Sequence, residues 1–218
     1  SDVYDEKNYV AGEGALLAHN TVSAISAFED LKGRGQAHRA LVITPAGLRD
    51  NFLNKGVARF TDSKGVILDR PEEVSNDTEY AVVSYDAFRR RPQEFIDKLK
   101  PDLLIADEVH RAANPGSKNY QVLKASRQSV PKFMGLTASV IQNRPEELVP
   151  LLELTSPTGT SSVGNPIQFR KAFIRRSASK DRGIFGGRTY EENLIRKALL
   201  KSRVGGSIHY VEDLDASE

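Results

Sequence analysis

The chain has 218 residues and a mass of 24.1 kDa, which suffices for one large domain and a short appendage but not for two large domains. Hydrophobic residues at 39% and charged residues at 28% are ordinary for a globular protein, and no apolar stretch approaches the roughly 20 residues of a membrane helix. The chain has no cysteine for disulfides or thiolate metal sites, and residues 1–6 lack the pattern of a secretory signal, so we expect an intracellular protein without membrane contact.

Short runs of β-forming residues alternate with helical patterns, which is typical of a parallel sheet with crossover helices. Runs such as Leu41–Ile43 and Leu103–Ile105 are apolar throughout, as expected of strands buried on both faces. The predicted strands are Ala15–Ala18, Ala40–Thr44, Gly65–Leu68, Tyr80–Ser84, Leu103–Ala106 and Phe133–Thr137. The predicted helices between them are Val22–Leu31, Leu48–Phe60 and Tyr120–Arg127. The sequence therefore predicts an α/β fold with a mostly parallel central sheet.

The pattern changes after Leu154, where a turn-rich linker without periodicity begins. We therefore divide the chain into a sheet domain, residues 1–154, and an appendage, residues 155–218. Two helices are predicted in the appendage, and two glycine-containing segments are predicted to be mobile. The helices are Pro166–Ile174 and Tyr190–Lys201, and the mobile segments are Gly183–Gly187 and Gly205–Gly206.

The formal net charge of +2 hides an uneven distribution along the appendage. Residues 170–203 hold 11 Lys and Arg against 3 Asp and Glu, whereas residues 204–218 hold 4 acidic residues and no Lys or Arg. A solvated helix face followed by a charged terminus would give this pattern, and so would a surface that contacts a nucleic-acid backbone. On the second reading, Arg175 and Arg176 are the expected contacts.

The strongest chemical signal is a pair of acids, Asp107 and Glu108, directly after the apolar run Leu103–Ala106. Open α/β sheets bind ligands at the carboxyl ends of their strands. In a nucleotide hydrolase the first acid holds Mg²⁺, because a hard cation prefers oxygen ligands, and the second orients or deprotonates the attacking water. The structural alternative is that Asp107 caps the next helix and Glu108 lies in its first turn.

Further along the chain, the residues around this pair form known motifs. Asp107-Glu108-Val109-His110 resembles the DExH box of superfamily-two helicases, and Gly135-Leu136-Thr137-Ala138-Ser139 resembles the third motif of that family. The continuation Val140-Ile141-Gln142-Asn143 is similar to the Swi/Snf branch, whose usual form is LTATPIQN, although Ser139-Val140 stands here in place of Thr-Pro.

This resemblance extends over roughly residues 12–176 and implies the fold and the cofactors. It implies a RecA-like three-layer sandwich with a helical C-terminal appendage, binding ATP and Mg²⁺. It assigns Asp107, Glu108 and His110 to catalysis, with Asp107 also a metal ligand. It assigns coupling of the nucleotide site to nucleic acid to Thr137, Ala138, Gln142 and Asn143.

Two other strand ends resemble nucleic-acid motifs of the same family. Thr44-Pro45 lies in a stretch similar to motif Ia, and Ser84-Tyr85 lies in a later motif at which a strand meets the nucleic-acid backbone. Hydroxyl groups and helix N-terminal amides can hold phosphates without reading bases. Taken singly, each stretch is also an ordinary buried strand that enters a turn.

The family's phosphate-binding loop, GxxxxGK[ST], has no match in this sequence. Gly14–Thr21 keeps the spacing but places His19 and Asn20 at the Gly-Lys positions, with Thr21 as the hydroxyl for Mg²⁺. On a second alignment Ala15–Ala18 is the first strand, and about five residues, including the lysine, are absent between Asn20 and Thr21. Either the lobe is degenerate, or the printed sequence lacks a segment that the protein carries there. As written, the chain should bind ATP poorly.

Three functions follow as hypotheses. The first is the N-terminal motor lobe of an ATP-dependent translocase on double-stranded DNA, working with a second RecA-like lobe of the same protein. The second is a nucleotide-independent lobe that binds DNA or a protein, and the third is a different α/β nucleotide protein. The first implies a location in the cytoplasm or nucleoid, or in the nucleus of a eukaryote.

Overall fold

The computed structural model describes residues 15–18, 21–137, 145–156, 158–182 and 188–194, together with residues 196, 199–200 and 203. Six strands within these ranges form one sheet in the order β1-β6-β5-β2-β4-β3, and all five pairings are parallel. The strands are β1 (Ala15–Ala18), β2 (Ala40–Thr44), β3 (Gly65–Leu68), β4 (Tyr80–Ser84), β5 (Leu103–Ala106) and β6 (Lys132–Leu136). The predicted parallel sheet is confirmed, with β6 one residue earlier than expected.

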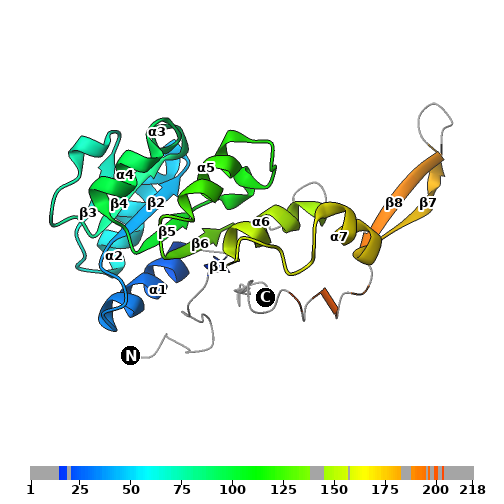
Figure 1. Ribbon diagram of the computed structural model, residues 1–218, viewed down its shortest axis with the longest axis horizontal. Coiled ribbons are helices and arrows are strands. Elements are labelled where there is room, and N and C mark those ends of the chain that lie inside the picture. Colours follow the sequence, from blue (N-terminus) through cyan, green and yellow to red (C-terminus); the bar gives the residue numbers. More distant parts are fainter. Residues whose placement is uncertain are drawn as a thin grey trace, which may run out of the picture.

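Helices cover both faces of this sheet, so the domain is the predicted three-layer sandwich (Figure 1). Side chains alternate between the two faces along each strand: Leu41 and Ile43 of β2 pack on one side and Val42 on the other. Each fully buried Leu, Ile or Phe contributes roughly 1.5–3 kcal/mol through removal of apolar surface from water. Both faces therefore stabilise the sheet, which explains why its strands are apolar throughout.

The helices that cover the first face are α3 (Tyr85–Arg90), α4 (Pro92–Leu99), α5 (Lys118–Ser126) and α6 (Leu148–Thr155). The second face is covered by α1 (Thr21–Gly33) and by the π-helical segment η2 (Asn51–Val57), which continues into α2 (Ala58–Phe60). Short 3-10 turns complete the connections: η1 (Ala46–Leu48), η3 (Pro71–Glu73), η4 (Val109–Ala112) and η5 (Pro145–Glu147).

The predicted helix Leu48–Phe60 is divided into three pieces, and its centre is a π-helix rather than an α-helix. Close packing accompanies this change, because Gly56 lies directly against α1. A Cβ atom at Gly56 would stand 2.9 Å from Ile25 Cδ1 and 3.4 Å from Thr21 Cγ2. Only glycine permits this approach without displacing a neighbour, so η2 and the first turn of α1 form a close contact.

The appendage contains helix α7 (Pro166–Phe173) followed by two antiparallel strands, β7 (Ile174–Arg182) and β8 (Arg188–Leu194). Figure 1 shows these strands at the far end of the molecule from β3. The prediction of a helix over Tyr190–Lys201 is therefore wrong at Tyr190–Leu194, where β8 pairs with β7. The pairing between strands overrides the helical pattern that the isolated sequence suggests. The two segments predicted to be mobile lie outside the described residues.

The domain boundary at residue 154 stays a prediction, and α6 has contacts on both sides of it. Leu151 and Leu154 pack in the core of the first sheet face, whereas Leu148 and Leu152 join a smaller core with Phe169 of α7. Arg170 of α7 also forms an ion pair with Glu146 of η5. The described part of the chain has no helix long and apolar enough to cross a bilayer.

Candidate functional site

The carboxyl ends of four neighbouring strands bring the predicted site residues together. Because β6, β5, β2 and β4 are parallel and adjacent, Thr137, Asp107, Thr44 and Ser84 all lie at or directly after the same edge of the sheet. In the β2–β4 register, Thr44 is paired with Ser84. This is the edge at which open α/β sheets bind their ligands.

Every polar atom of Asp107 forms a hydrogen bond. Its amide donates to the carbonyl of Ile43 at 2.8 Å, and its Oδ2 accepts a hydrogen bond from the Thr44 hydroxyl at 2.8 Å. Its Oδ1 accepts from the amide of Glu108 at 3.0 Å. Burial raises the pKa of the Asp107 carboxyl, as does the charge of Glu108, although these two hydrogen bonds and His110 act in the opposite direction. The carboxylate is therefore fixed in one orientation.

Glu108 has a left-handed backbone conformation, with φ 51° and ψ 47°. Residues other than glycine adopt this conformation rarely, and it costs roughly 1 kcal/mol. Glu108 Oε2 lies 3.1 Å from His110 Nδ1 but has no hydrogen bond of good geometry with any described residue, although it is buried. The strained backbone thus places a buried carboxylate oxygen beside the His110 ring.

His110 connects this acid pair to the end of β6. Its Nδ1 lies 3.1 Å from the Thr137 hydroxyl, and Thr137 is only 4% exposed. The same nitrogen faces Glu108 Oε2 at the same distance, so one ring nitrogen serves two oxygen neighbours. The geometry links two segments that are 27 residues apart in the sequence. The coupling role of Thr137 stays a prediction.

The two strand ends assigned to nucleic acid are placed beside Asp107. Ser84 is the N-cap of α3 and accepts a hydrogen bond from the amide of Ala87 at 3.0 Å, while Pro45 is half-buried between β2 and η1. Tyr85 is buried, and its hydroxyl donates to the carbonyl oxygen of Asp107 at 2.7 Å. Burial and the charge of Asp107 raise the pKa of this hydroxyl, which therefore stays protonated and donates. Sequence reasoning did not anticipate this contact, because no spacing rule connects the two residues.

Other predicted site residues are placed elsewhere or lie outside the described residues. Thr21 begins α1 and is half-buried. Arg175 is exposed on β7, which also contains Arg176. The residues outside the described ranges are His19, Asn20, Ala138, Gln142 and Asn143.

The residues at this sheet edge are suited to binding Mg²⁺, but the sequence lacks the residues that would hold the phosphates of a nucleotide. The described residues contain no group of three His, Asp or Glu side chains that could hold a metal ion by themselves. Mg²⁺ in nucleotide hydrolases is held by one or two carboxylates and by the substrate phosphates, so the Asp107 carboxylate suffices on the protein side. The phosphate cradle does not fit, since the sequence lacks its Gly-Lys pair.

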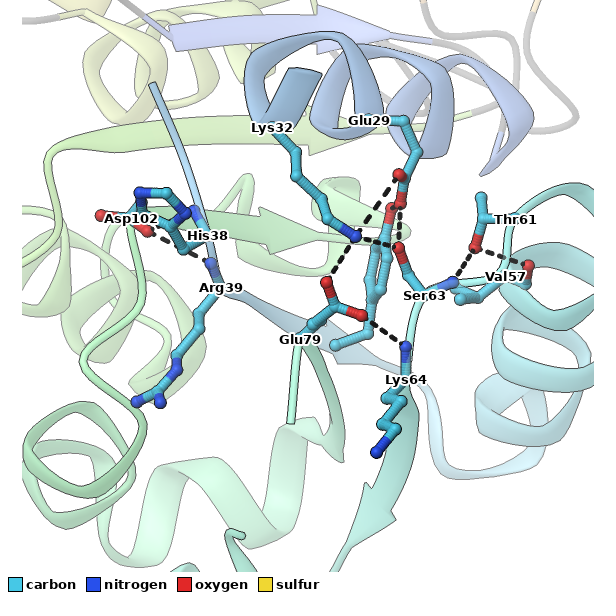
Figure 2. Close-up of polar contacts among 11 residues, drawn as sticks. Glu29, Lys32, His38, Arg39, Val57, Thr61, Ser63, Lys64, Glu79 and Asp102 are labelled. Carbon is cyan, nitrogen blue, oxygen red and sulfur yellow. Dashed lines mark hydrogen bonds and ion pairs between the residues drawn. The ribbon is translucent and has the colours of Figure 1, made fainter. Parts of the chain in front are cut away.

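A second polar cluster lies at the opposite, amino edge of the sheet (Figure 2). Ser63 and Tyr80 both donate to Glu29 Oε1, at 2.7 and 3.0 Å, and Lys32 donates to Ser63 at 2.7 Å while pairing with Glu79. Burial raises the pKa of Tyr80, and the neighbouring Glu29 adds to this effect. Since each of these groups is bound to another, the cluster joins α1 to β4 and to the turn before β3.

An open cavity of about 450 Å³ adjoins this cluster, far from the acid pair. It is lined by both signs of charge: Lys32, Arg39 and Lys64 face Asp62, Asp77 and Glu79. Arg39 donates to the backbone carbonyls of Leu99 and Asn76, so its guanidinium closes loops of the fold. We assign the cavity to the architecture of this edge.

Comparison with known proteins gives relatives of one kind, although no family model matches the chain. The uncharacterized ATP-dependent helicase YqhH of Bacillus subtilis is 27% identical over 185 residues, which cover 84% of this chain and 31% of that protein. The RNA polymerase-associated protein RapA of Erwinia tasmaniensis is 26% identical over 174 residues, which cover 74% of this chain and 17% of RapA. The chain thus spans less than a third of the length of either relative.

Among solved structures, the SWI2/SNF2 ATPase core of Sulfolobus solfataricus in complex with dsDNA has the same fold. Its TM-score is 0.66 at 18% sequence identity, and the match covers 94% of this chain and 41% of that chain. A separate structure of the SWI2/SNF2 ATPase core domain of Sulfolobus solfataricus gives a TM-score of 0.65. The motifs at the sheet edge and these relatives resemble the Swi/Snf-type branch of superfamily-two helicases, and the fold is that of a SWI2/SNF2 ATPase core.

Proposed function

We propose that the chain is the N-terminal motor lobe of a protein that couples ATP hydrolysis to movement on double-stranded DNA. One observation carries the proposal: Asp107, Glu108, His110 and Thr137 form one connected group at the carboxyl edge of a parallel sheet. The names of the relatives, which include helicases and a core bound to dsDNA, support this class of activity. Such a motor would work where DNA is, in the cytoplasm, the nucleoid or a nucleus.

The residues of the chain have distinct roles in this proposal. Bound Mg²⁺ and ATP would supply the phosphoanhydride whose hydrolysis drives movement. Asp107, fixed by Thr44 and the Glu108 amide, is the protein ligand for the cation. Glu108, whose Oε2 lies beside His110, would be the general base that accepts a proton from the attacking water. His110 and Thr137 connect this reaction to the β6 end, where the coupling segment begins.

A second RecA-like lobe, outside this chain, is part of the proposal. A single lobe offers one wall of the nucleotide cleft, and motors of this type complete the site with arginines from a second lobe. The isolated lobe should therefore hydrolyse ATP poorly by itself.

Replacing the Glu108 carboxylate with an amide tests whether Glu108 is the general base. In the intact protein that carries this lobe, Glu108→Gln should reduce kcat at least 100-fold, since removal of a general base typically costs 10²–10⁴-fold. ATP binding should survive, because Asp107 still holds the cation. Glu153→Gln, an acid on α6 that binds Tyr120, is the control and should keep kcat. Unchanged turnover in Glu108→Gln would reject the assignment.

The missing phosphate loop favours a second candidate, a lobe that binds DNA or a protein without nucleotide. Intact mass and peptide mapping across Asn20–Thr21 decide between the two. A chain of 24.1 kDa with these residues adjacent supports the nucleotide-independent lobe, whose DNA affinity should not change with ATP. A heavier chain with a Gly-Lys-Thr peptide at this point supports the motor.

A further inference from the structure

Two hydroxyl groups from neighbouring strand ends converge on Asp107. Thr44, at the end of β2, donates to the carboxylate, and Tyr85, directly after β4, donates to the backbone carbonyl. These are the strand ends at which the sequence places nucleic-acid contacts. The Tyr85 ring is 7% exposed and packs in the core of the first sheet face, so its hydroxyl has little freedom to turn elsewhere.

The carbonyl of Asp107 belongs to the peptide that joins the two acids. The Asp107 amide continues the pairing of β5 with β2, but the chain turns at Glu108, and β5 ends at Ala106. The Tyr85 hydroxyl donates to the Asp107 carbonyl in place of the backbone amide that a neighbouring strand would otherwise supply. A buried carbonyl without such a donor costs roughly 1–3 kcal/mol. The hydroxyl thus fixes the plane of the Asp107–Glu108 peptide.

The orientation of this peptide determines where the Glu108 side chain points. Rotation about the Glu108 N–Cα bond starts from this peptide plane, and Glu108 is held at φ 51°, a conformation that the chain leaves readily when unsupported. The Glu108 amide also donates to Asp107 Oδ1, so a tilt of the peptide moves both carboxylates together. One hydroxyl group therefore supports the geometry of the whole acid pair.

We propose that Tyr85 is a positioning residue: its hydroxyl holds the Asp107–Glu108 peptide in the reactive orientation and links the β4–α3 turn to the acid pair. The inference rests on the proposed function and adds a route by which DNA bound at this turn acts on hydrolysis. Ser84 caps α3, and Tyr85 is the first residue of that helix, so a movement of the turn reaches the Asp107 carbonyl through one side chain. Because Tyr85 is buried, it would act through the Asp107 carbonyl and not on the reacting groups themselves.

Tyr85→Phe removes only the hydroxyl and tests this role in the intact protein that carries the lobe. We expect kcat at saturating DNA to fall about tenfold, while the KM for ATP and the DNA concentration for half-maximal stimulation change less than twofold. Hydrogen exchange at the Glu108 amide should become faster. Tyr120→Phe is the matched control, because Tyr120 lies in the same core and its hydroxyl binds Glu153 instead. It should leave kcat and the Glu108 amide unchanged.

The outcomes separate this inference from the function on which it rests. Wild-type protein without DNA-stimulated hydrolysis, or undiminished turnover in Glu108→Gln, would overturn the proposed function. A normal kcat in Tyr85→Phe, in an enzyme that passes both tests, would overturn the positioning role alone. An equal fall of kcat in Tyr85→Phe and Tyr120→Phe would also overturn it, since both would then act through stability. If Tyr85→Phe does not fold, Tyr85→Leu keeps an apolar side chain and should show the same selective loss of kcat.

Discussion

Gly56 determines how closely the π-helical segment approaches the helix that begins at Thr21. Gly56→Ala would place a Cβ 2.9 Å from Ile25 Cδ1, so the Ile25 side chain must shift within the core. We expect a loss of about 1–3 kcal/mol in the free energy of unfolding, which is the usual cost of overpacking a core. Urea denaturation measures it. Gly47→Ala is the control, because a Cβ there has no neighbour within 4 Å and should change stability by less than about 0.5 kcal/mol.

Asp77 makes stability depend on pH at the amino edge of the sheet. Hydrogen bonds from Lys64 and Ser75, together with the charge of Lys64, lower the pKa of Asp77 from 3.8 to about 2. A carboxyl whose pKa is lower in the folded state stabilises the protein above its unfolded pKa, and this contribution disappears as the pH falls toward 2.

Asp77→Asn removes this contribution and measures it. The difference in the free energy of unfolding between the wild type and the variant should be full above about pH 4 and should shrink as the pH falls to 2. The pair is exposed, so added salt should reduce the difference at each pH. A difference that stays constant from pH 5 to pH 2 would show that the ion pair is not responsible.

At the scale of elements, one ion pair attaches α7 to the short turn η5. Arg170 pairs with Glu146, whose side chain is only 14% exposed and whose second carboxylate oxygen is buried without a hydrogen bond from any described residue. Arg170→Met leaves this carboxylate without its partner. We expect a loss of about 1–3 kcal/mol, less than for a fully buried pair because Arg170 is 36% exposed.

Lys171→Met is the matched control for this prediction. Lys171 is the next residue of the same helix, has the same charge and is exposed, so its loss should cost less than about 0.5 kcal/mol. Urea denaturation and hydrogen exchange across α7 report the two effects. Equal losses in the two variants would assign them to helix charge instead of to the ion pair.

The elements differ in how well the sequence predicts them. The six strands of the main sheet were predictable because burial on both faces leaves continuous apolar runs such as Leu41–Ile43. Strands β7 and β8 are rich in charged residues and carry no such signal, so only their pairing reveals them. The acid pair was predictable from its motif, whereas the bond from Tyr85 to the Asp107 carbonyl depends on packing between α3 and β5.

At the scale of the molecule, the basic strand β7 projects from a domain whose acid pair lies at the sheet edge (Figure 1). If β7 contacts DNA, Arg175→Glu with Arg176→Glu should weaken DNA binding at least tenfold. The slope of log affinity against log salt should fall by about 2, which corresponds to two lost phosphate contacts. Fluorescence anisotropy over a salt series measures both quantities.

The control changes the same net charge on another surface. Lys98→Glu with Lys118→Glu alters two exposed residues of α4 and α5, and it should change the salt slope much less. Equal effects of the two double variants would mean that DNA responds to total charge and not to β7. That result would mean that the basic segment is a solvated surface and not a DNA contact.

The order of strands in the sheet also determines the order in which a growing chain can fold. Strand β1 is at one end of the sheet, and its neighbour β6 is the last of the six strands to be synthesised: Ala15 lies beside Phe133. The ribosome therefore releases β1 first, yet this strand must wait for nearly the whole domain before it can pair. The β1 end of the sheet is thus completed last, and a nascent chain stalled before β6 should leave β1 open to proteases.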